Sequence, residues 1–128
     1  MNPTKKILVI EDEQILRDLY VIILKEAGFE VYQAADGPSG LEAMSKGGHD
    51  LVLLDIMLPG IDGLSILDKI SKKPPAQPNK IVVILSNLGQ DSAIAQAVSL
   101  GARGYMIKSD YTPDQIVAEV KRYLSEGS

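Results

Sequence analysis

The hydrophobic residues of this chain fall into short continuous runs that alternate with longer stretches of helical spacing. Three of the runs are wholly apolar, as expected of strands buried on both faces of a parallel sheet; they cover residues 7–10, 51–54 and 81–85. Two shorter or more polar runs, at residues 30–34 and 105–107, predict strands at the edges of the same sheet. The pattern therefore predicts five strands.

Apolar residues recur every three or four positions after each of these runs, which predicts five helices. Gly28 and Gly101 are natural ends for the first and fourth helices. Asp36 is a predicted cap for the second helix, and Thr112 followed by a proline is a strong start for the fifth. The stretch 71–79 contains three prolines and is expected to be a loop.

The regular alternation of strands and helices predicts the architecture. Short connections between parallel strands require right-handed crossovers and helices on both faces of the sheet. With the three most apolar strands in the middle, the pattern selects the strand order 2-1-3-4-5, a flavodoxin-like, doubly wound five-stranded parallel sheet with five helices on two faces. A closed barrel would need more strands. Since no repeat or linker interrupts the pattern, we expect residues 1–128 to form a single domain.

The composition argues against several classes of protein. The net charge of −4 and the isoelectric point near 4.9 argue against direct binding of nucleic acid. The chain has no cysteine, which excludes disulfides, cysteine-bound zinc and thiol chemistry. No apolar run approaches the ~20 residues of a membrane helix, and the chain leads straight into its first strand without a signal-peptide pattern. We therefore expect a cytoplasmic protein that does not enter a membrane.

Charged and hydroxyl side chains stand at the ends of four predicted strands. They are Glu11 and Asp12 after the first strand, Asp55 after the third, Ser86 after the fourth and Lys108 after the fifth. In the order 2-1-3-4-5 these strand ends share one rim, where α/β sheets bind ligands. Three carboxylates in a small site need a cation, and oxygen ligands without His or Cys suit Mg²⁺. Lys108 and Ser86 would then neutralise the oxygens of a phosphoryl group, with Asp55 as the nucleophile.

Most of these residues also have a purely structural interpretation. Asp12 or Glu13 would cap the first helix. Ser86 would form hydrogen bonds within its own loop, and Lys108 would be a solvated side chain at a strand end. The structural alternative is weakest for Asp55, because no helix that it would cap begins directly after it. Five such groups on one rim favour a functional site over a coincidence of structural roles.

Four stretches of the chain carry a resemblance to a known family. They are residues 7–13 (ILVIEDE), 55–63 (DIMLPGIDG), 84–86 (ILS) and 101–108 (GARGYMIK). Taken together, at this spacing, they resemble the receiver domain of two-component response regulators, to which the bacterial chemotaxis regulator belongs. The resemblance extends over essentially the whole chain. It implies a phosphorelay switch that assists its own phosphotransfer and is not a conventional enzyme.

The resemblance also implies roles for the residues of the predicted site. Asp55 would accept phosphate from a phosphohistidine on a sensor histidine kinase or a phosphotransfer protein. Mg²⁺, or Mn²⁺, would bind to Asp12, Asp55 and the Met57 carbonyl, with Glu11 acting through water. Lys108 would pair with the phosphoryl group or with Asp55.

A second implied role is signalling to a partner. The resemblance makes Ser86 and Tyr105 a switch pair: Ser86 moves inward to the phosphoryl group, and the Tyr105 ring rotates into the space it leaves. This motion would change the surface made by the fourth helix, the fifth strand and the fifth helix. An unidentified downstream protein or effector domain would bind there, or a second copy in a homodimer. The structural alternative for Tyr105 is an aromatic residue of an edge strand, half-covered by the fourth helix.

Several residues depart from the family pattern or lie outside it. Family members usually have proline after the lysine, often with a cis bond; here Ser109 follows, and we expect a trans bond or a strained cis bond. Asn87 is larger than the usual small residue and is expected to narrow phosphate access. The long proline-containing loop at 71–79 should lie on the opposite rim. Asp62 is assigned to a turn, and His49, the single histidine, to a surface loop.

Three other functions are compatible with this fold. A flavodoxin-like electron carrier or dinucleotide binder would need a glycine- or hydroxyl-rich phosphate loop after the first strand, where this chain has residues 11–13 (EDE). A phosphatase with an aspartate nucleophile would need a second acid at the place of Met57. The main rival is a receiver that binds partners without being phosphorylated.

Overall fold

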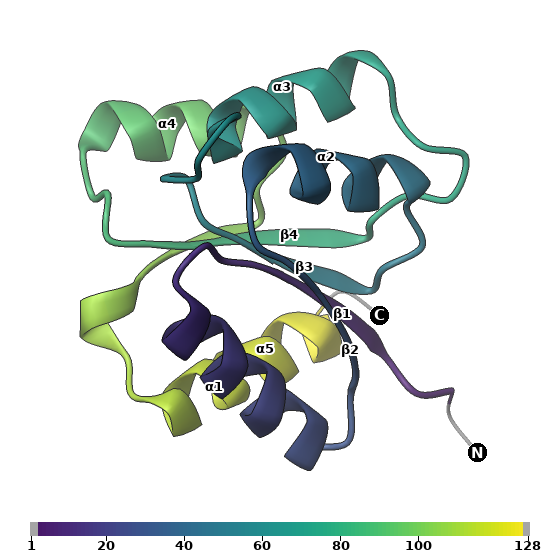
Figure 1. Ribbon diagram of the computed structural model, residues 1–128, viewed down its shortest axis with the longest axis vertical. Coiled ribbons are helices and arrows are strands. Elements are labelled where there is room, and N and C mark those ends of the chain that lie inside the picture. The colour runs from purple at the N-terminus through teal and green to yellow at the C-terminus, as the bar shows by residue number, and fades with distance from the viewer. Residues whose placement is uncertain (1–2, 127–128) are drawn as a thin grey trace.

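The computed structural model describes residues 3–126 and contains one parallel five-stranded sheet with helices on both faces (Figure 1). The strands are β1 (Lys6–Ile10), β2 (Glu30–Ala34), β3 (Leu51–Leu54), β4 (Ile81–Ser86) and β5 (Gly104–Ile107). The helices are α1 (Gln14–Glu26), α2 (Gly37–Lys46), α3 (Gly63–Lys72), α4 (Asp91–Ser99) and α5 (Pro113–Glu126), and a 3₁₀ turn covers Lys108–Asp110. The strand order β2-β1-β3-β4-β5 confirms the predicted topology. Within the described residues, no helix combines the length and the apolar content needed to cross a membrane.

The core has two halves, because each face of the sheet packs against its own layer of helices (Figure 1). Ile7 and Val9 of β1 belong to the half beneath α1 and α5, whereas Leu8 and Ile10 belong to the half beneath α2, α3 and α4. All four side chains are at most 1% exposed. A strand covered on both faces must be apolar at every position, which explains the continuous hydrophobic runs.

The register of the strands aligns the ends of the central three. Ile10 of β1 pairs with Leu54 of β3, which in turn pairs with Ile84 of β4. The residues that follow Ile10 and Leu54 are therefore neighbours, and the Asp55 N–H still donates to the Ile10 carbonyl at 3.1 Å. Because β5 runs parallel to β4, its carboxyl end opens on the same rim.

The ends of the helices largely follow the prediction. Gly28 and Gly101 come after α1 and α4 with φ angles of 99° and 105°, which glycine adopts without strain. Asp36 caps α2 and Thr112 caps α5, each accepting from the backbone N–H three residues later, at 2.8 and 3.2 Å. The assignment of Asp62 to a turn needs correction: its carboxylate accepts from the N–H three residues later at 2.9 Å and caps α3. The helix begins directly after Asp62, which leaves this residue in the capping position.

The expectation that His49 is a surface residue is wrong. His49 is only 8% exposed, its Nδ1 lies 2.7 Å from Oδ1 of Asn79, and its ring meets Tyr32 edge-on. Asn79 also donates to the Met44 carbonyl at 2.9 Å. The bonds of Asn79 fasten the proline-containing loop to α2 and to the His49 ring. The loop lies at the amino ends of the strands, on the rim opposite Asp55, as predicted.

Candidate functional site

Asp55 is held at the end of β3 by a tight turn, and it is only 4% exposed. The Gly63 N–H donates to the Ile56 carbonyl at 2.8 Å, so the start of α3 folds back against the end of the strand. A Cβ atom on Gly63 would lie 2.4 Å from the Asp55 carbonyl oxygen, so only glycine fits at this contact. The strand and the turn together fix the direction of the Asp55 carboxylate.

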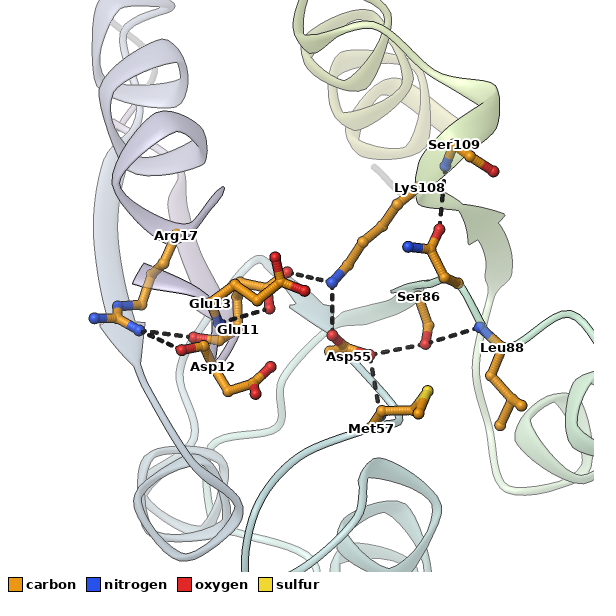
Figure 2. Close-up of polar contacts among 11 residues, drawn as sticks. Glu11, Asp12, Glu13, Arg17, Asp55, Met57, Ser86, Leu88, Lys108 and Ser109 are labelled. Atoms are coloured by element: carbon orange, nitrogen blue, oxygen red, sulfur yellow. Dashed lines mark hydrogen bonds and ion pairs between the residues drawn. The ribbon is translucent and has the colours of Figure 1, made fainter. Parts of the chain in front are cut away.

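Both oxygens of the Asp55 carboxylate accept hydrogen bonds from other elements (Figure 2). Oδ1 accepts from the Ser86 hydroxyl at 2.8 Å and from the Met57 N–H at 3.0 Å. Oδ2 accepts from the Lys108 ammonium at 2.7 Å. Ser86 is fully buried and the Lys108 side chain is 8% exposed, so water competes little for these bonds. The structure thus brings three of the predicted site residues together around one carboxylate.

Lys108 also forms an ion pair with Glu11, whose side chain is 2% exposed. Burial raises the pKa of Glu11, although the bonds from Lys108 and from the Glu13 N–H partly offset this effect. For Lys108, burial alone would lower the pKa, but the carboxylates of Asp55 and Glu11 outweigh it and raise the pKa. Lys108 is therefore a charged ammonium at neutral pH, and Glu11 is easier to protonate than a solvent-exposed glutamate.

Three acids form a cluster of the size that a divalent cation needs. Carboxylate oxygens of Glu11, Asp12 and Asp55 lie within 4.8 Å of one another, and Asp12 is the exposed member. Oε1 of Glu11 is buried without a hydrogen bond, although the Lys108 ammonium lies next to it. The all-oxygen ligand set fits Mg²⁺, which binds a few carboxylates and keeps several waters. Glu13 makes no side-chain hydrogen bond at the N-cap of α1, so the capping alternative is wrong for that residue.

Ser86 and Tyr105 are connected through a single residue, Leu88. The Leu88 N–H donates to Oγ of Ser86 at 3.3 Å, and the Tyr105 hydroxyl donates to the Leu88 carbonyl. Burial is the main cause that raises the pKa of Tyr105, and the negative charge of Asp55 adds to it. The phenol therefore remains a hydrogen-bond donor at neutral pH. Ser86 therefore bonds both to Asp55 and to its own loop, as the structural interpretation predicted for the loop bond. No sequence signal singled out Leu88, because it takes part through its backbone.

Arg17 is a residue of the site that the sequence analysis did not identify. Its Nη1 donates to the carbonyls of Glu11 at 3.0 Å and Asp12 at 3.4 Å (Figure 2). Its Nε donates to the Gln33 side chain at 3.2 Å, at the neighbouring strand β2. The guanidinium thus ties the backbone of the acidic loop to the edge of the sheet. The usable signal is its place in the first turns of α1, because helical side chains lean toward the helix N-terminus and reach the preceding loop.

The Lys108–Ser109 peptide bond is trans, which confirms the first of the two predicted outcomes; no cis bond occurs in residues 3–126. With serine at position 109, the Lys108 ammonium reaches Asp55. The Ser109 N–H donates to Oδ1 of Asn87 at 3.2 Å. The two departures from the family pattern are therefore in direct contact.

Comparisons with known proteins agree with this geometry. The sequence profile of the response regulator receiver domain matches residues 7–121. The sensory transduction protein RegX3 of Mycolicibacterium smegmatis is 32% identical over 124 residues, covering 95% of this chain and 51% of RegX3. The regulatory protein VanRc of Enterococcus gallinarum is 37% identical over 121 residues, covering 94% of this chain and 50% of VanRc. The chain thus spans about half the length of these relatives.

Other relatives match along nearly their whole length. Sporulation initiation phosphotransferase F of Bacillus subtilis is 33% identical over 120 residues, which cover 94% of each chain. The crystal structure of a CheY-like receiver domain protein from Methanospirillum hungatei superposes with a TM-score of 0.86 at 26% identity, covering 98% of this chain and 97% of that one. The chain belongs to the receiver domains of two-component response regulators, the domains that act as signalling switches in phosphorelays.

Proposed function

We propose that Asp55 accepts a phosphoryl group from a phosphohistidine of a sensor histidine kinase or a phosphotransfer protein. One observation carries the proposal: a buried carboxylate on a rigid strand end is bonded to a hydroxyl and an ammonium and lies beside two further acids. In the transfer, an oxygen of Asp55 attacks phosphorus and the P–N bond breaks. The imidazole nitrogen keeps the electron pair of that bond.

The hydrogen-bond donors that now bind Asp55 are placed to bind the oxygens of the phosphoryl group after its transfer to Asp55. Ser86 and Lys108 approach different oxygens of the carboxylate, so they flank the position that an incoming phosphoryl group would occupy. Each would exchange its carboxylate acceptor for a phosphoryl oxygen. The ammonium charge of Lys108 offsets negative charge that develops there in the transition state. The Met57 N–H would continue to orient the carboxylate.

Glu11, Asp12 and Asp55 would hold Mg²⁺ or Mn²⁺, with the Met57 carbonyl as a further ligand and Glu11 acting through water. When bound, the ion stabilises negative charge on the phosphoryl and carboxylate oxygens. The charge balance supports this assignment, because the three clustered carboxylates carry more negative charge than the Lys108 ammonium offsets. Arg17 keeps the acidic loop in place through its bonds to two backbone carbonyls.

Phosphorylation would be transmitted to the surface through Leu88. The phosphoryl group adds close to two negative charges, which would draw the Ser86 hydroxyl away from the Leu88 N–H. The same residue holds the Tyr105 hydroxyl through its carbonyl, so a change at Ser86 alters the environment of Tyr105. The surface of α4, β5 and α5 would then bind a downstream protein or effector domain, or a second copy. Val98 of α4, which is 55% exposed, offers apolar area on that helix.

In this proposal the chain is one receiver module, residues 1–128, that works in the cytoplasm as a switch. It is not a conventional enzyme, because its own carboxylate is the acceptor. It binds no nucleic acid directly, consistent with its net charge of −4.

Intact-protein mass spectrometry tests the proposal. With Mg²⁺ and a small phosphodonor such as phosphoramidate, the wild type should gain one phosphoryl group, and Asp55→Asn should gain none. Asp62→Asn, at the exposed cap of α3, is the matched control and should be modified like the wild type. Beryllofluoride with Mg²⁺ should also shift amide resonances of α4, β5 and α5. An unmodified wild type with an unchanged spectrum would contradict the proposal and favour a receiver that binds partners without phosphorylation.

A further inference from the structure

One hydrogen bond joins the ends of β4 and β5 beyond the last pair of the sheet. The register of these strands ends at Ser86 and Ile107. Just past this point, the Ser109 N–H donates to Oδ1 of Asn87 at 3.2 Å. The side chain of Asn87 therefore supplies one more connection between the two strands where the backbone ladder has ended.

This bond closes a ring through the site. Ser86 donates to one oxygen of Asp55, and Lys108 donates to the other (Figure 2). Ser86 is covalently joined to Asn87, and Lys108 is covalently joined to Ser109. The Asn87–Ser109 hydrogen bond is the connection that completes the ring. It adds to the pairing of Ser86 with Ile107 in fixing the two donors to Asp55 relative to one another, although neither Asn87 nor Ser109 is buried.

The same bond accounts for both departures from the family pattern. A proline at position 109 would have no N–H, so the Asn87 side chain would lose its donor. A small residue at position 87 would offer no side-chain acceptor to the Ser109 N–H. Asn87 and Ser109 are therefore matched to each other, with a trans peptide bond before Ser109.

We propose that Asn87 is a positioning residue for phosphoryl transfer, which acts through the Ser109 backbone to hold Lys108 against Asp55. The inference rests on the proposed role of Asp55 as phosphoryl acceptor. On its other side, Lys108 is anchored by its 3₁₀ turn, in which the Tyr111 N–H donates to the Lys108 carbonyl at 3.3 Å. Loss of the Asn87 bond leaves only this turn and the pairing of Ile107 with Ser86 to restrain the Lys108 backbone, so the ammonium spends less time on the Asp55 oxygen.

A double-mutant cycle on the rate of phosphorylation by phosphoramidate tests the role. Asn87→Ala should slow phosphorylation about three- to tenfold, the range that the loss of one hydrogen bond produces. Ser109→Ala keeps the N–H and is the matched control, with an unchanged rate. Ser109→Pro removes the N–H and should slow the reaction, and Asn87→Ala should add nothing in that background. Mg²⁺ affinity should stay within about twofold in Asn87→Ala, because no metal ligand is altered.

Two outcomes would overturn the positioning role of Asn87 and leave the proposed function of Asp55 intact. An Asn87→Ala protein that reacts faster than the wild type would mean that the side chain obstructs phosphate access. An unchanged rate, with the wild type phosphorylated normally, would mean that the bond does not position Lys108. A wild type that takes no phosphoryl group would overturn the proposed function and this role with it.

Hydrogen exchange of the Ser109 amide, followed by NMR, reports on the bond without any phosphodonor. We expect a protected amide in the wild type and in Ser109→Ala, and faster exchange in Asn87→Ala. This measurement also replaces the Ser109→Pro arm if that variant does not fold. An equally unprotected amide in the wild type and in Asn87→Ala would overturn the inference.

Discussion

Replacing Lys108 by methionine removes the cation that contacts both buried carboxylates of the site. Methionine keeps most of the length of the side chain, so the loss of packing is small. The side chains of Lys108, Glu11 and Asp55 are 8%, 2% and 5% exposed, so solvent screens the remaining charges poorly. The variant must therefore bury two neighbouring carboxylates without their counter-ion, or protonate one of them.

The structure sets the size of the expected effect. Breaking a buried ion pair by removing one partner costs ~3–5 kcal/mol. Asp12 is the exposed member of the acidic cluster, and Glu11 can take up a proton. We therefore expect the lower end of this range of unfolding free energy, ~3 kcal/mol. For a domain of 128 residues, 1 kcal/mol corresponds to ~3–5 °C, so the midpoint of thermal unfolding should fall by about 10–15 °C at pH 7.

Thermal unfolding followed by circular dichroism, with and without a chelator, measures this effect. Mg²⁺ should raise the midpoint of Lys108→Met more than that of the wild type, because the cation then meets uncompensated carboxylates. The control is Lys46→Met, which breaks a surface ion pair with Glu42. The two side chains are 76% and 72% exposed, so the midpoint of thermal unfolding should change little. The reasoning would be refuted if the midpoint of Lys108→Met fell no further than that of the control. It would also be refuted if Mg²⁺ raised the midpoint of Lys108→Met no more than that of the wild type.

The pH dependence of the same comparison has a defined sign. The folded state raises the pKa of Lys108, so its stabilisation is fully present below the pKa of an unfolded lysine, ~10.4. That stabilisation is lost as the pH rises through the higher folded pKa. At acidic pH Glu11, whose pKa is raised, takes up a proton, and the difference between Lys108→Met and the wild type should shrink.

Three further changes test other parts of the site. Glu11→Gln should stabilise the metal-free protein at pH 7, because folding raises the pKa of Glu11. The contribution of Glu11 to the free energy of unfolding is favourable below its unfolded pKa of ~4.3 and is lost as the pH rises through the folded pKa. Melting curves across this pH range should show the gain disappear in acid. Arg17→Met should weaken Mg²⁺ binding about two- to tenfold in calorimetry, whereas Lys25→Met in the last turn of α1 should not. Gly63→Ala should lower the free energy of unfolding in urea by ~2 kcal/mol or more, because its Cβ would lie 2.4 Å from the Asp55 carbonyl oxygen.

The fold and the composition of the rim could be predicted from the sequence because they depend on local patterns. A strand such as β3, covered on both faces, needs an apolar residue at every position, and its first polar residue marks its end. The ends of the strands then locate Glu11, Asp55 and Lys108 without knowledge of any contact. The glycines after α1 and α4 likewise mark places where the backbone takes a positive φ.

The contacts that connect the site could not be predicted, because they form between distant segments. The bond from Ser109 to Asn87 spans 22 residues, and that between His49 and Asn79 spans 30. An exposed asparagine bonds whichever backbone group the tertiary structure brings near, and no local pattern encodes that group. Leu88 acts through its N–H and carbonyl, so its side chain carries no signal for its position between Ser86 and Tyr105.

The central claim is that Asp55 is the phosphoryl acceptor on this rim. The most direct test is peptide mapping by mass spectrometry after incubation with Mg²⁺ and phosphoramidate and then reduction with borohydride, which converts an aspartyl phosphate to homoserine. We predict homoserine at position 55 in the wild type, and no homoserine when Mg²⁺ is omitted. Homoserine at Asp12 or at another acid, or none in the wild type, would contradict the claim.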